Sequence, residues 1–290
     1  MGYVYLIAST VFSTSISLIG TGFNRKTGDQ KNATLLYNLI NIATALVAWC
    51  IFWLTDFSFN ASVLWYSLGF GVSYFLANFG LIGALANGST SLTALAMQLS
   101  SITAAVWGFF FWDEDFTVPV AIGLVLIVAA LVICLYQRGD GKQGFSFKWA
   151  FFAFLAFLGN SGCCIIQRTT VRNCGIASTK AMMFFAMILA TLSCVVFYLK
   201  SKSERPVEIV KKAGGFPVLA GVMNSLNNLV VILLSDPSLG VDASFFYPVL
   251  SISGLALTSI GSLLFFRERL TKRQWIGMGV GAVAVALLAL

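Results

Sequence analysis

The chain has 290 residues, of which 58% are hydrophobic and only 10% are charged, and its formal net charge is +7. Soluble domains carry about 25% charged residues, because most of their surface must stay hydrated. This composition excludes a water-soluble enzyme, a nucleic-acid-binding protein and a disordered chain. It is typical of a membrane protein, in which the placement of Lys and Arg matters more than their sum.

Charged residues divide the chain into uncharged runs of the length that a membrane-spanning helix requires, which is about 20 apolar residues. The run 57–112 is long enough for two helices, and residues 87–90 (Asn-Gly-Ser-Thr) predict a turn between them. We therefore predict an all-α membrane protein with ten transmembrane helices. The runs cover residues 1–24, 32–55, 57–112, 116–137, 149–167, 181–199, 213–235, 243–266 and 274–290.

The loops between these runs differ strongly in charge. The connections after the first, third, fifth, seventh and ninth predicted helices contain 15 of the 18 Lys and Arg residues, and the others contain only Arg168, Arg172 and Lys180. The positive-inside rule places the cation-rich loops in the cytoplasm, and therefore both termini outside. We expect a multi-pass protein of a cell membrane, with a bacterial plasma membrane as the first choice.

A short motif occurs once near the end of each half of the chain. Residues 114–123 and 268–277 both read Glu-x-x-Thr-x5-Gly after an aromatic-rich helix, at an offset of 154 residues. Earlier in the halves the offset is about 146, which aligns residues 13–15 with residues 159–161. Because each half has five predicted helices, the second half must enter the membrane from the opposite side. Inverted repeats of this kind are common in secondary transporters.

Two five-helix halves that each close with this motif resemble the EamA-type members of the drug/metabolite transporter superfamily. The resemblance covers the whole chain and predicts repeats over residues 1–142 and 143–290. It implies that helices 1–4 and 6–9 surround a central cavity, while helices 5 and 10 are peripheral. Members of this family export metabolites or drugs, or import sugars and similar nutrients. Many are thought to have cytoplasmic termini, whereas the loop charges of this chain indicate the reverse.

Polar residues at membrane depth are costly and therefore indicate a substrate pathway, although each one alone is also typical of a contact between helices. None of the eleven carboxylates is predicted in the middle of a span. The first helix lacks the buried Glu with which small multidrug members of the superfamily exchange protons. The predicted substrate-binding residues are Ser13, Asn38, Tyr74, Asn78, Gln98, Asn160, Gln167, Arg168, Asn224, Asn228, Tyr247 and Ser251.

Four further features are relevant. Three of them, namely Arg168, the glycines of the last helix and Pro248, have two interpretations each. Arg168 either extends to the membrane interface or binds a substrate carboxylate or phosphate. Gly277 and Gly281 form a GxxxG spacing, which indicates close packing inside the chain or a homodimer through the last helix. Pro248 bends the ninth helix as a hinge or as a simple kink. The segment 203–212 is predicted to be an interfacial helix beside anionic lipids.

The sequence has no histidine, and so lacks the commonest metal ligand and the usual general base. Its six cysteines have no CxxC spacing and are interpreted as small buried side chains. We therefore expect no catalytic residue, no metal and no cofactor, and an enzyme acting inside the membrane is disfavoured.

We predict a secondary transporter that moves a small polar solute, uncharged or zwitterionic and amino-acid-like, by alternating access. The expected partners are this solute and membrane lipid, and no nucleic acid. A sugar or nutrient uptake permease on the same fold and a lipid-carrier flippase are the alternatives. Without a buried carboxylate, facilitated diffusion is favoured over obligate proton antiport.

Overall fold

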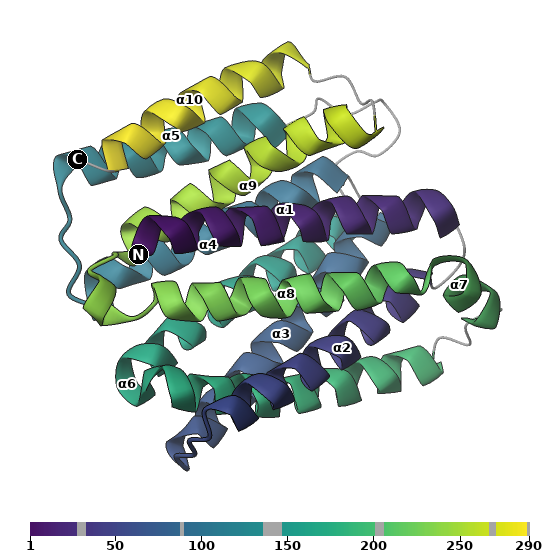
Figure 1. Cartoon of the computed structure of the whole chain (residues 1–290). Coiled ribbons are helices and arrows are strands. Elements are labelled where there is room, and N and C mark those ends of the chain that lie inside the picture. Colours follow the sequence, from purple (N-terminus) through teal and green to yellow (C-terminus); the bar gives the residue numbers. More distant parts are fainter. Residues whose placement is uncertain (28–32, 88–89, 136–146, 201–205, 267–270, 289–290) are drawn as a thin grey trace. The chain divides into compact units, whose positions relative to one another are not determined.

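The computed structural model describes residues 1–27, 33–87, 90–135, 147–200, 206–266 and 271–288, which are almost entirely helical and include no β-strand (Figure 1). The short elements are helix α7 (Pro206–Ala213) and the 3-10 turn η1 (Pro237–Leu239). The long helices are α1 (Gly2–Thr27), α2 (Ala33–Thr55), α3 (Ser62–Asn87), α4 (Thr90–Phe111), α5 (Val118–Leu135), α6 (Phe147–Lys200), α8 (Gly215–Leu234), α9 (Ala243–Phe266) and α10 (Lys272–Leu288).

Seven helices of the described residues are long and apolar enough to cross a membrane, namely α1, α2, α3, α4, α6, α8 and α9. Helix α5 is equally apolar but shorter. The run 57–112 contains two helices, as predicted, because α3 ends at Asn87 and α4 begins at Thr90. The predicted turn includes Gly88 and Ser89, which lie outside the described residues. The total of ten transmembrane helices remains a prediction.

Helix α6 is 54 residues long because two helices join at Gly175. Gly175 has a φ of +79°, a left-handed conformation that only glycine adopts at low cost. The sequence predicted a loop between the run that ends at residue 167 and the run that begins at residue 181. This prediction was wrong, because the connecting residues are helical. Residues 168–180 continue the helices on both sides of one sharp bend.

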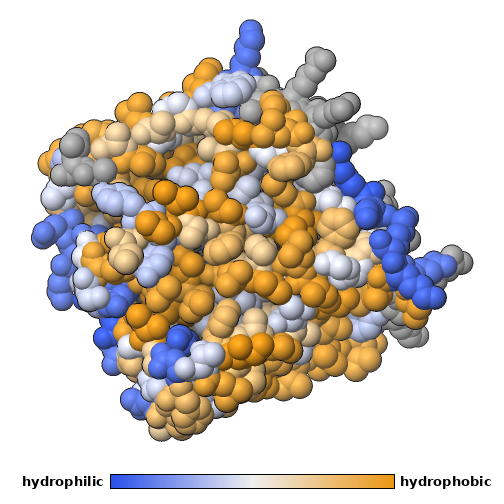
Figure 2. All heavy atoms as spheres, viewed as in Figure 1, coloured by the Kyte–Doolittle hydropathy of each residue, from blue (hydrophilic) through white to orange (hydrophobic). Residues whose placement is uncertain are grey.

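Apolar side chains cover most of the face shown in Figure 2. Large hydrophobic residues such as Trp65, Val125 and Leu192 are exposed rather than packed inside. Surface of this kind is unfavourable in water and is typical of contact with lipid tails. The described fold is therefore that of a multi-pass membrane protein, as the composition predicted.

The chain separates into two compact units, and each combines two distant stretches. Unit 1 contains Met1–Val72 and Gln167–Asp236, and unit 2 contains Ser73–Ile166 and Pro237–Leu290. Each unit therefore takes residues from both predicted repeats, whose boundary was placed after residue 142. These units describe which residues pack together and do not test the sequence repeat. The repeat boundaries therefore remain a prediction.

In unit 1, helix α8 packs against both α1 and α2 (Figure 1). The approach of α8 to α2 depends on Gly221, where an added Cβ would lie 2.5 Å from the carbonyl oxygen of Asn41. Small residues permit such close contact between helix backbones. A second glycine plays the same part between α3 and α6, because a Cβ at Gly71 would lie 3.1 Å from the side chain of Leu189.

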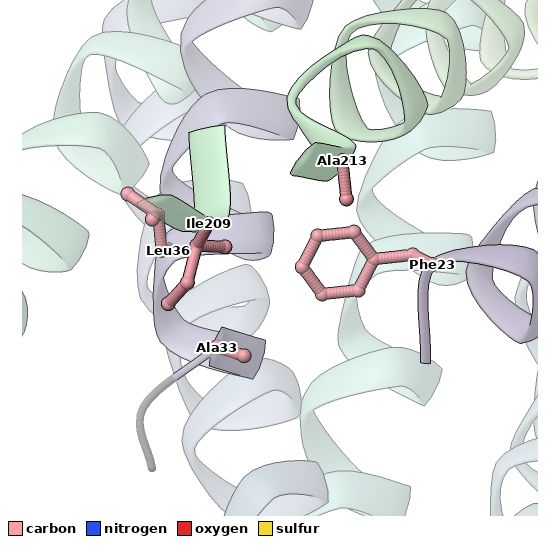
Figure 3. Close-up of a cluster of buried hydrophobic side chains, with 5 residues drawn as sticks. All are labelled: Phe23, Ala33, Leu36, Ile209 and Ala213. Atoms are coloured by element: carbon pink, nitrogen blue, oxygen red, sulfur yellow. The ribbon is translucent and has the colours of Figure 1, made fainter. Parts of the chain in front are cut away.

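The short helix α7 overlaps the segment 203–212 that was predicted to be interfacial, and it packs against one end of α1 and one end of α2. Ile209 of α7 is buried, whereas Val207 and Val210 are exposed. The buried side contributes to a small hydrophobic cluster, so α7 is anchored by its own apolar face. The cluster consists of Phe23, Ala33, Leu36, Ile209 and Ala213 (Figure 3).

In unit 2, helices α5 and α10 pack side by side (Figure 1). A Cβ at Gly277 would lie 2.4 Å from Cys134 Sγ of α5, and a Cβ at Gly281 would lie 2.4 Å from Ile252 of α9. The GxxxG spacing thus serves packing inside this chain. A Cβ at Gly279 would meet nothing within 4 Å. A homodimer through α10, which remains a prediction, would need a face other than that of Gly277 and Gly281.

Candidate functional site

Polar side chains of α1, α6 and α8 form hydrogen bonds with one another in unit 1. Asn228 Nδ2 donates to Asn224 Oδ1 at 2.9 Å, and Gln167 Nε2 donates to Asn228 Oδ1 at 3.4 Å. At the adjacent residue of α8, Ser9 Oγ donates to Asn227 Oδ1 at 2.7 Å. The structure therefore brings together three predicted residues, Gln167, Asn224 and Asn228. A third contact involves Ser9 and Asn227, which were not among the predicted binding residues.

Ser13 and Asn38 do not join this network. Ser13 Oγ donates to the carbonyl oxygen of Thr10 in its own helix at 3.0 Å. Asn38 is half-buried, and within the described residues its side chain has no hydrogen-bond partner. Polar residues of α1 and α2 therefore differ in whether they contact the network. Their spacing in the sequence does not show which of them do.

Two neighbours of these residues are buried polar groups without a hydrogen-bond partner in the described part of the chain. They are Thr14 Oγ1, in a side chain 6% exposed, and Asn41 Oδ1, in a side chain 8% exposed. An unsatisfied buried polar atom costs about 1–3 kcal/mol, and lipid cannot supply the missing partner. Neither residue was among the predicted binding residues. The only sequence signal was their position in polar runs.

The three cations of the cation-poor loops have different surroundings. Arg168 is 2% exposed, so the interpretation that it extends to the membrane interface was wrong. A buried guanidinium requires compensating interactions, because its desolvation is costly. Lys180 Nζ lies 3.0 Å from Asp56 Oδ2 in a partly exposed ion pair. Arg172 is half-buried.

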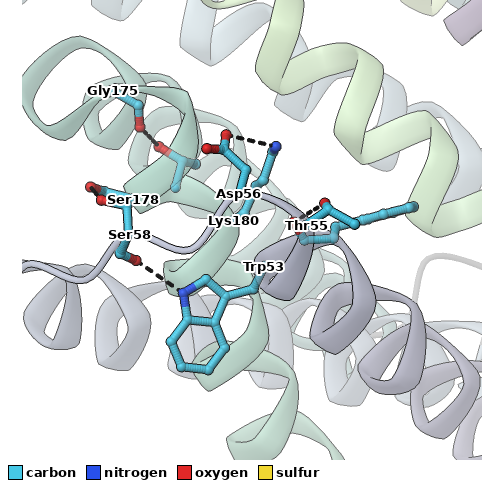
Figure 4. Close-up of polar contacts among 9 residues, drawn as sticks. Trp53, Thr55, Asp56, Ser58, Gly175, Ser178 and Lys180 are labelled. Carbon is cyan, nitrogen blue, oxygen red and sulfur yellow. Dashed lines mark hydrogen bonds and ion pairs between the residues drawn. The ribbon is translucent and has the colours of Figure 1, made fainter.

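The ion pair of Lys180 belongs to a set of contacts around the bend at Gly175 (Figure 4). Trp53 Nε1 donates to the carbonyl oxygen of Ser58 at 2.9 Å, and the hydroxyls of Ser58 and Ser178 lie 3.1 Å apart. The segment that follows α2 is thereby attached to the part of α6 that begins after the bend. These contacts hold the bend in one place within unit 1.

Unit 2 contains its own polar contacts, and two predicted residues take part in them. Asn160 Nδ2 of α6 donates to Ser100 Oγ of α4 at 2.6 Å. The hydroxyl of Tyr247 in α9 donates to the carbonyl oxygen of Cys164 in α6 at 2.9 Å. Both contacts cross between helices, so Asn160 and Tyr247 hold α4 and α9 against α6.

The other predicted residues of unit 2 are Tyr74, Asn78, Gln98 and Ser251. Asn78 Nδ2 donates to the carbonyl oxygen of Tyr74 in the same helix at 2.9 Å. Gln98 is half-buried and Ser251 is buried, and no hydrogen bond joins them to Asn160 within the described residues. The predicted set is thus distributed over both units.

The Glu-x-x-Thr-x5-Gly motif has a structural explanation in the first half. Glu114 is 8% exposed, and its Oε1 and Oε2 accept hydrogen bonds from the backbone N–H groups of Ala243 and Ser244 at 2.8 and 2.9 Å. These groups begin α9, and a carboxylate stabilises the exposed N–H groups at the start of a helix. The counterpart Glu268 lies outside the described residues.

Comparison with known proteins identifies the family. No curated protein matched the sequence. One crystal structure, whose title says only "Crystal structure of protein", has a TM-score of 0.76 and 14% sequence identity, over 99% of this chain and 96% of that chain. At this identity the likeness shows a shared fold alone. The family model described as "Sugar transport protein" matches residues 6–290. The chain therefore belongs to the sugar transport protein family, a family of membrane transporters of the drug/metabolite transporter type.

Proposed function

We propose that this protein is a secondary transporter for a small neutral polar solute, with monosaccharides as the first substrate class. The observation that carries the proposal is the network of Gln167, Asn224 and Asn228 around the middle of α8. Amide side chains both donate and accept hydrogen bonds, which suits the hydroxyl groups of a sugar. The description of the family supports the same substrate class.

We infer that transport proceeds by alternating access, in ten transmembrane helices arranged as two inverted repeats of the EamA type. Seven candidate spans, the break that divides α6 at Gly175, and the shorter helices α5 and α10 support this number of helices. A repeated contact supports the repeat itself. Gly71 packs on Ala186 and Leu189, and Gly221 packs at the matching positions on Asn41 and Thr44.

An amino-acid-like solute is the second candidate, and the burial of Arg168 favours it. A guanidinium in a water-poor place is well suited to bind a carboxylate. This candidate predicts that amino acids compete for the site, whereas the first predicts that sugars do. The lipid-carrier flippase has less support, because it would need accessible cations, and Arg168 is buried and Lys180 is paired with Asp56.

The test is a binding and uptake panel on the full-length protein. Thermal shift in detergent with aldohexoses, aldopentoses, amino acids and quaternary amines would identify the class that stabilises the folded state. Uptake of the stabilising solute into proteoliposomes would follow. Stabilisation and uptake of at least one monosaccharide are expected. Stabilisation by amino acids alone would overturn the sugar proposal in favour of the second candidate.

A further inference from the structure

Thr14 differs from every other serine and threonine of α1. In the described residues, Thr10, Ser13, Ser15, Ser17, Thr21 and Thr27 each donate to a backbone carbonyl of α1, and Ser9 donates to Asn227. The hydroxyl of Thr14 has no such partner, although its side chain is buried. Thr14 also lies at the centre of α1 (Gly2–Thr27), where a transporter of this type binds its solute.

Asn41 of α2 lies at the same level of unit 1 as Thr14. Helices α1 and α8 run antiparallel, because Ser9 bonds to Asn227 while Gly22 packs on Phe216. By interpolation Thr14 lies opposite about residue 223 of α8, given the constant rise of a helix. Asn41 lies beside Gly221. The two unsatisfied polar groups are therefore within about one helical turn of the same level, beside the network of Asn224 and Asn228.

The predicted repeat supplies a comparison for Thr14. Its counterpart at an offset of 146 is Asn160, which uses its amide to bond Ser100 of α4. Both halves thus have a polar side chain at this position. In the second half that side chain is used to hold two helices together, whereas in the first half the hydroxyl is unused.

We propose that Thr14 Oγ1 and Asn41 Oδ1 bind hydroxyl groups of the transported solute, which deepens the proposed function and rests on it. Val and Leu have nearly the same shapes as Thr and Asn and would remove the cost of an unsatisfied polar atom. Retaining the polar atoms is favourable only if a ligand pairs with them. A sugar hydroxyl both donates to the Asn41 oxygen and exchanges hydrogen bonds with Thr14.

The experiment uses Thr14→Val and Asn41→Leu in the full-length protein. The matched controls are Thr10→Val and Thr44→Val, whose hydroxyls are bonded to their own helices. Ligand-free thermal midpoints and dissociation constants are measured for the tightest-binding monosaccharide of the panel and for its monodeoxy analogues. Each test variant is expected to keep or raise the midpoint and to bind the sugar about tenfold more weakly, which corresponds to one lost hydrogen bond. Controls are expected to bind within about twofold of the original protein, which corresponds to less than about 0.5 kcal/mol.

The deoxy analogues show whether the contact is direct. An analogue that lacks the hydroxyl bound by Thr14 should bind the original protein and Thr14→Val equally, as in a double-mutant cycle. Unchanged affinity of both test variants for the sugar would overturn this inference while leaving the sugar proposal intact. Failure of the original protein to bind any monosaccharide would overturn both. A lowered midpoint in Thr14→Val would also contradict the inference, because it would show that the hydroxyl already has a structural partner.

Discussion

The carboxylate of Glu114 accepts a hydrogen bond from the backbone N–H of Ser244 at 2.9 Å, across 130 residues of sequence. Its other oxygen accepts from Ala243, so one side chain connects the end of α4 to the start of α9. The motif that marked the two halves of the sequence is thus, in its first copy, a helix cap. A side chain at position 108 would not fit, because a Cβ there would lie 2.6 Å from Glu114 Oε2.

Removing this cap should destabilise unit 2. Glu114→Ala is expected to lower the free energy of unfolding by about 2 kcal/mol, the usual effect of losing charged hydrogen bonds at a helix start. Glu114→Gln should lose less, because its amide oxygen still accepts one bond. The measurement is the thermal midpoint in detergent, with Asp115→Asn at an exposed neighbouring carboxylate as the control. Equal midpoints for Glu114→Ala and Asp115→Asn would contradict the capping role.

Two glycines of α10 provide a matched test of packing inside the chain. Gly277→Ala should lower stability by about 1–3 kcal/mol, because its Cβ would collide with Cys134. Gly279→Ala should be neutral or stabilise by up to about 1 kcal/mol, because the position is open and alanine favours the helix. Thermal midpoints of the two variants give the comparison. A loss of stability at Gly279 that equals the loss at Gly277 would show that both faces of α10 are packed.

The ion pair of Lys180 and Asp56 should contribute little, although Lys180 is one of three cations in the cation-poor loops. Asp56 is mostly exposed, and exposed pairs contribute about 0.2–1 kcal/mol. A double-mutant cycle with Asp56→Asn and Lys180→Gln should give a coupling energy in that range, decreasing as salt is added. A coupling above about 2 kcal/mol would show that the pair is shielded from water, beyond the range of exposed pairs.

Arg168 separates the two substrate candidates. Arg168→Gln should abolish the binding of carboxylate-bearing solutes if this guanidinium binds them, because their anionic group would lose its partner. The binding of neutral sugars should then change by less than about threefold, or about 0.7 kcal/mol. Competition binding with both solute classes is the measurement, on protein first checked for an intact thermal transition. Identical binding of both classes before and after the substitution would remove Arg168 from the site.

Transport should depend weakly on a proton gradient. No carboxylate was predicted in the middle of a span, and the buried Glu114 is occupied in capping α9. Proteoliposome uptake is expected to change by less than about twofold when an imposed pH gradient is collapsed with a protonophore, since only groups that titrate in the pathway can couple to protons. A steep dependence on the pH gradient would contradict this prediction and would indicate a titrating group in the transport pathway.

The helices were predictable from the sequence because length and apolarity decide whether a segment can cross lipid. The division between α3 and α4 and the apolar character of α5 followed from local residue types. The helical structure of residues 168–180 was not predicted. Charged residues in a membrane protein usually mark a loop, and the sequence does not show whether they are buried. Burial of Arg168 depends on neighbours that are distant in the sequence.

The types of residue in the candidate site were predictable, but only some of the individual residues were. Amides on α6 and α8 were expected, and Gln167, Asn224 and Asn228 do meet. The choice of Ser13 over Thr14 could not be settled from the sequence, because adjacent residues on a helix point about 100° apart and either one fits a polar stripe.

The sequence by itself determined that this is an all-helical membrane protein with neutral polar groups in its spans, because the cost of placing charge in lipid leaves a direct mark on composition. Only the tertiary structure decided which polar atoms hold helices together and which remain unsatisfied. It also decided that Gly277 and Gly281 pack inside the chain and that Glu114 caps a helix 129 residues away. These properties depend on which distant residues become neighbours, and no local pattern encodes that information.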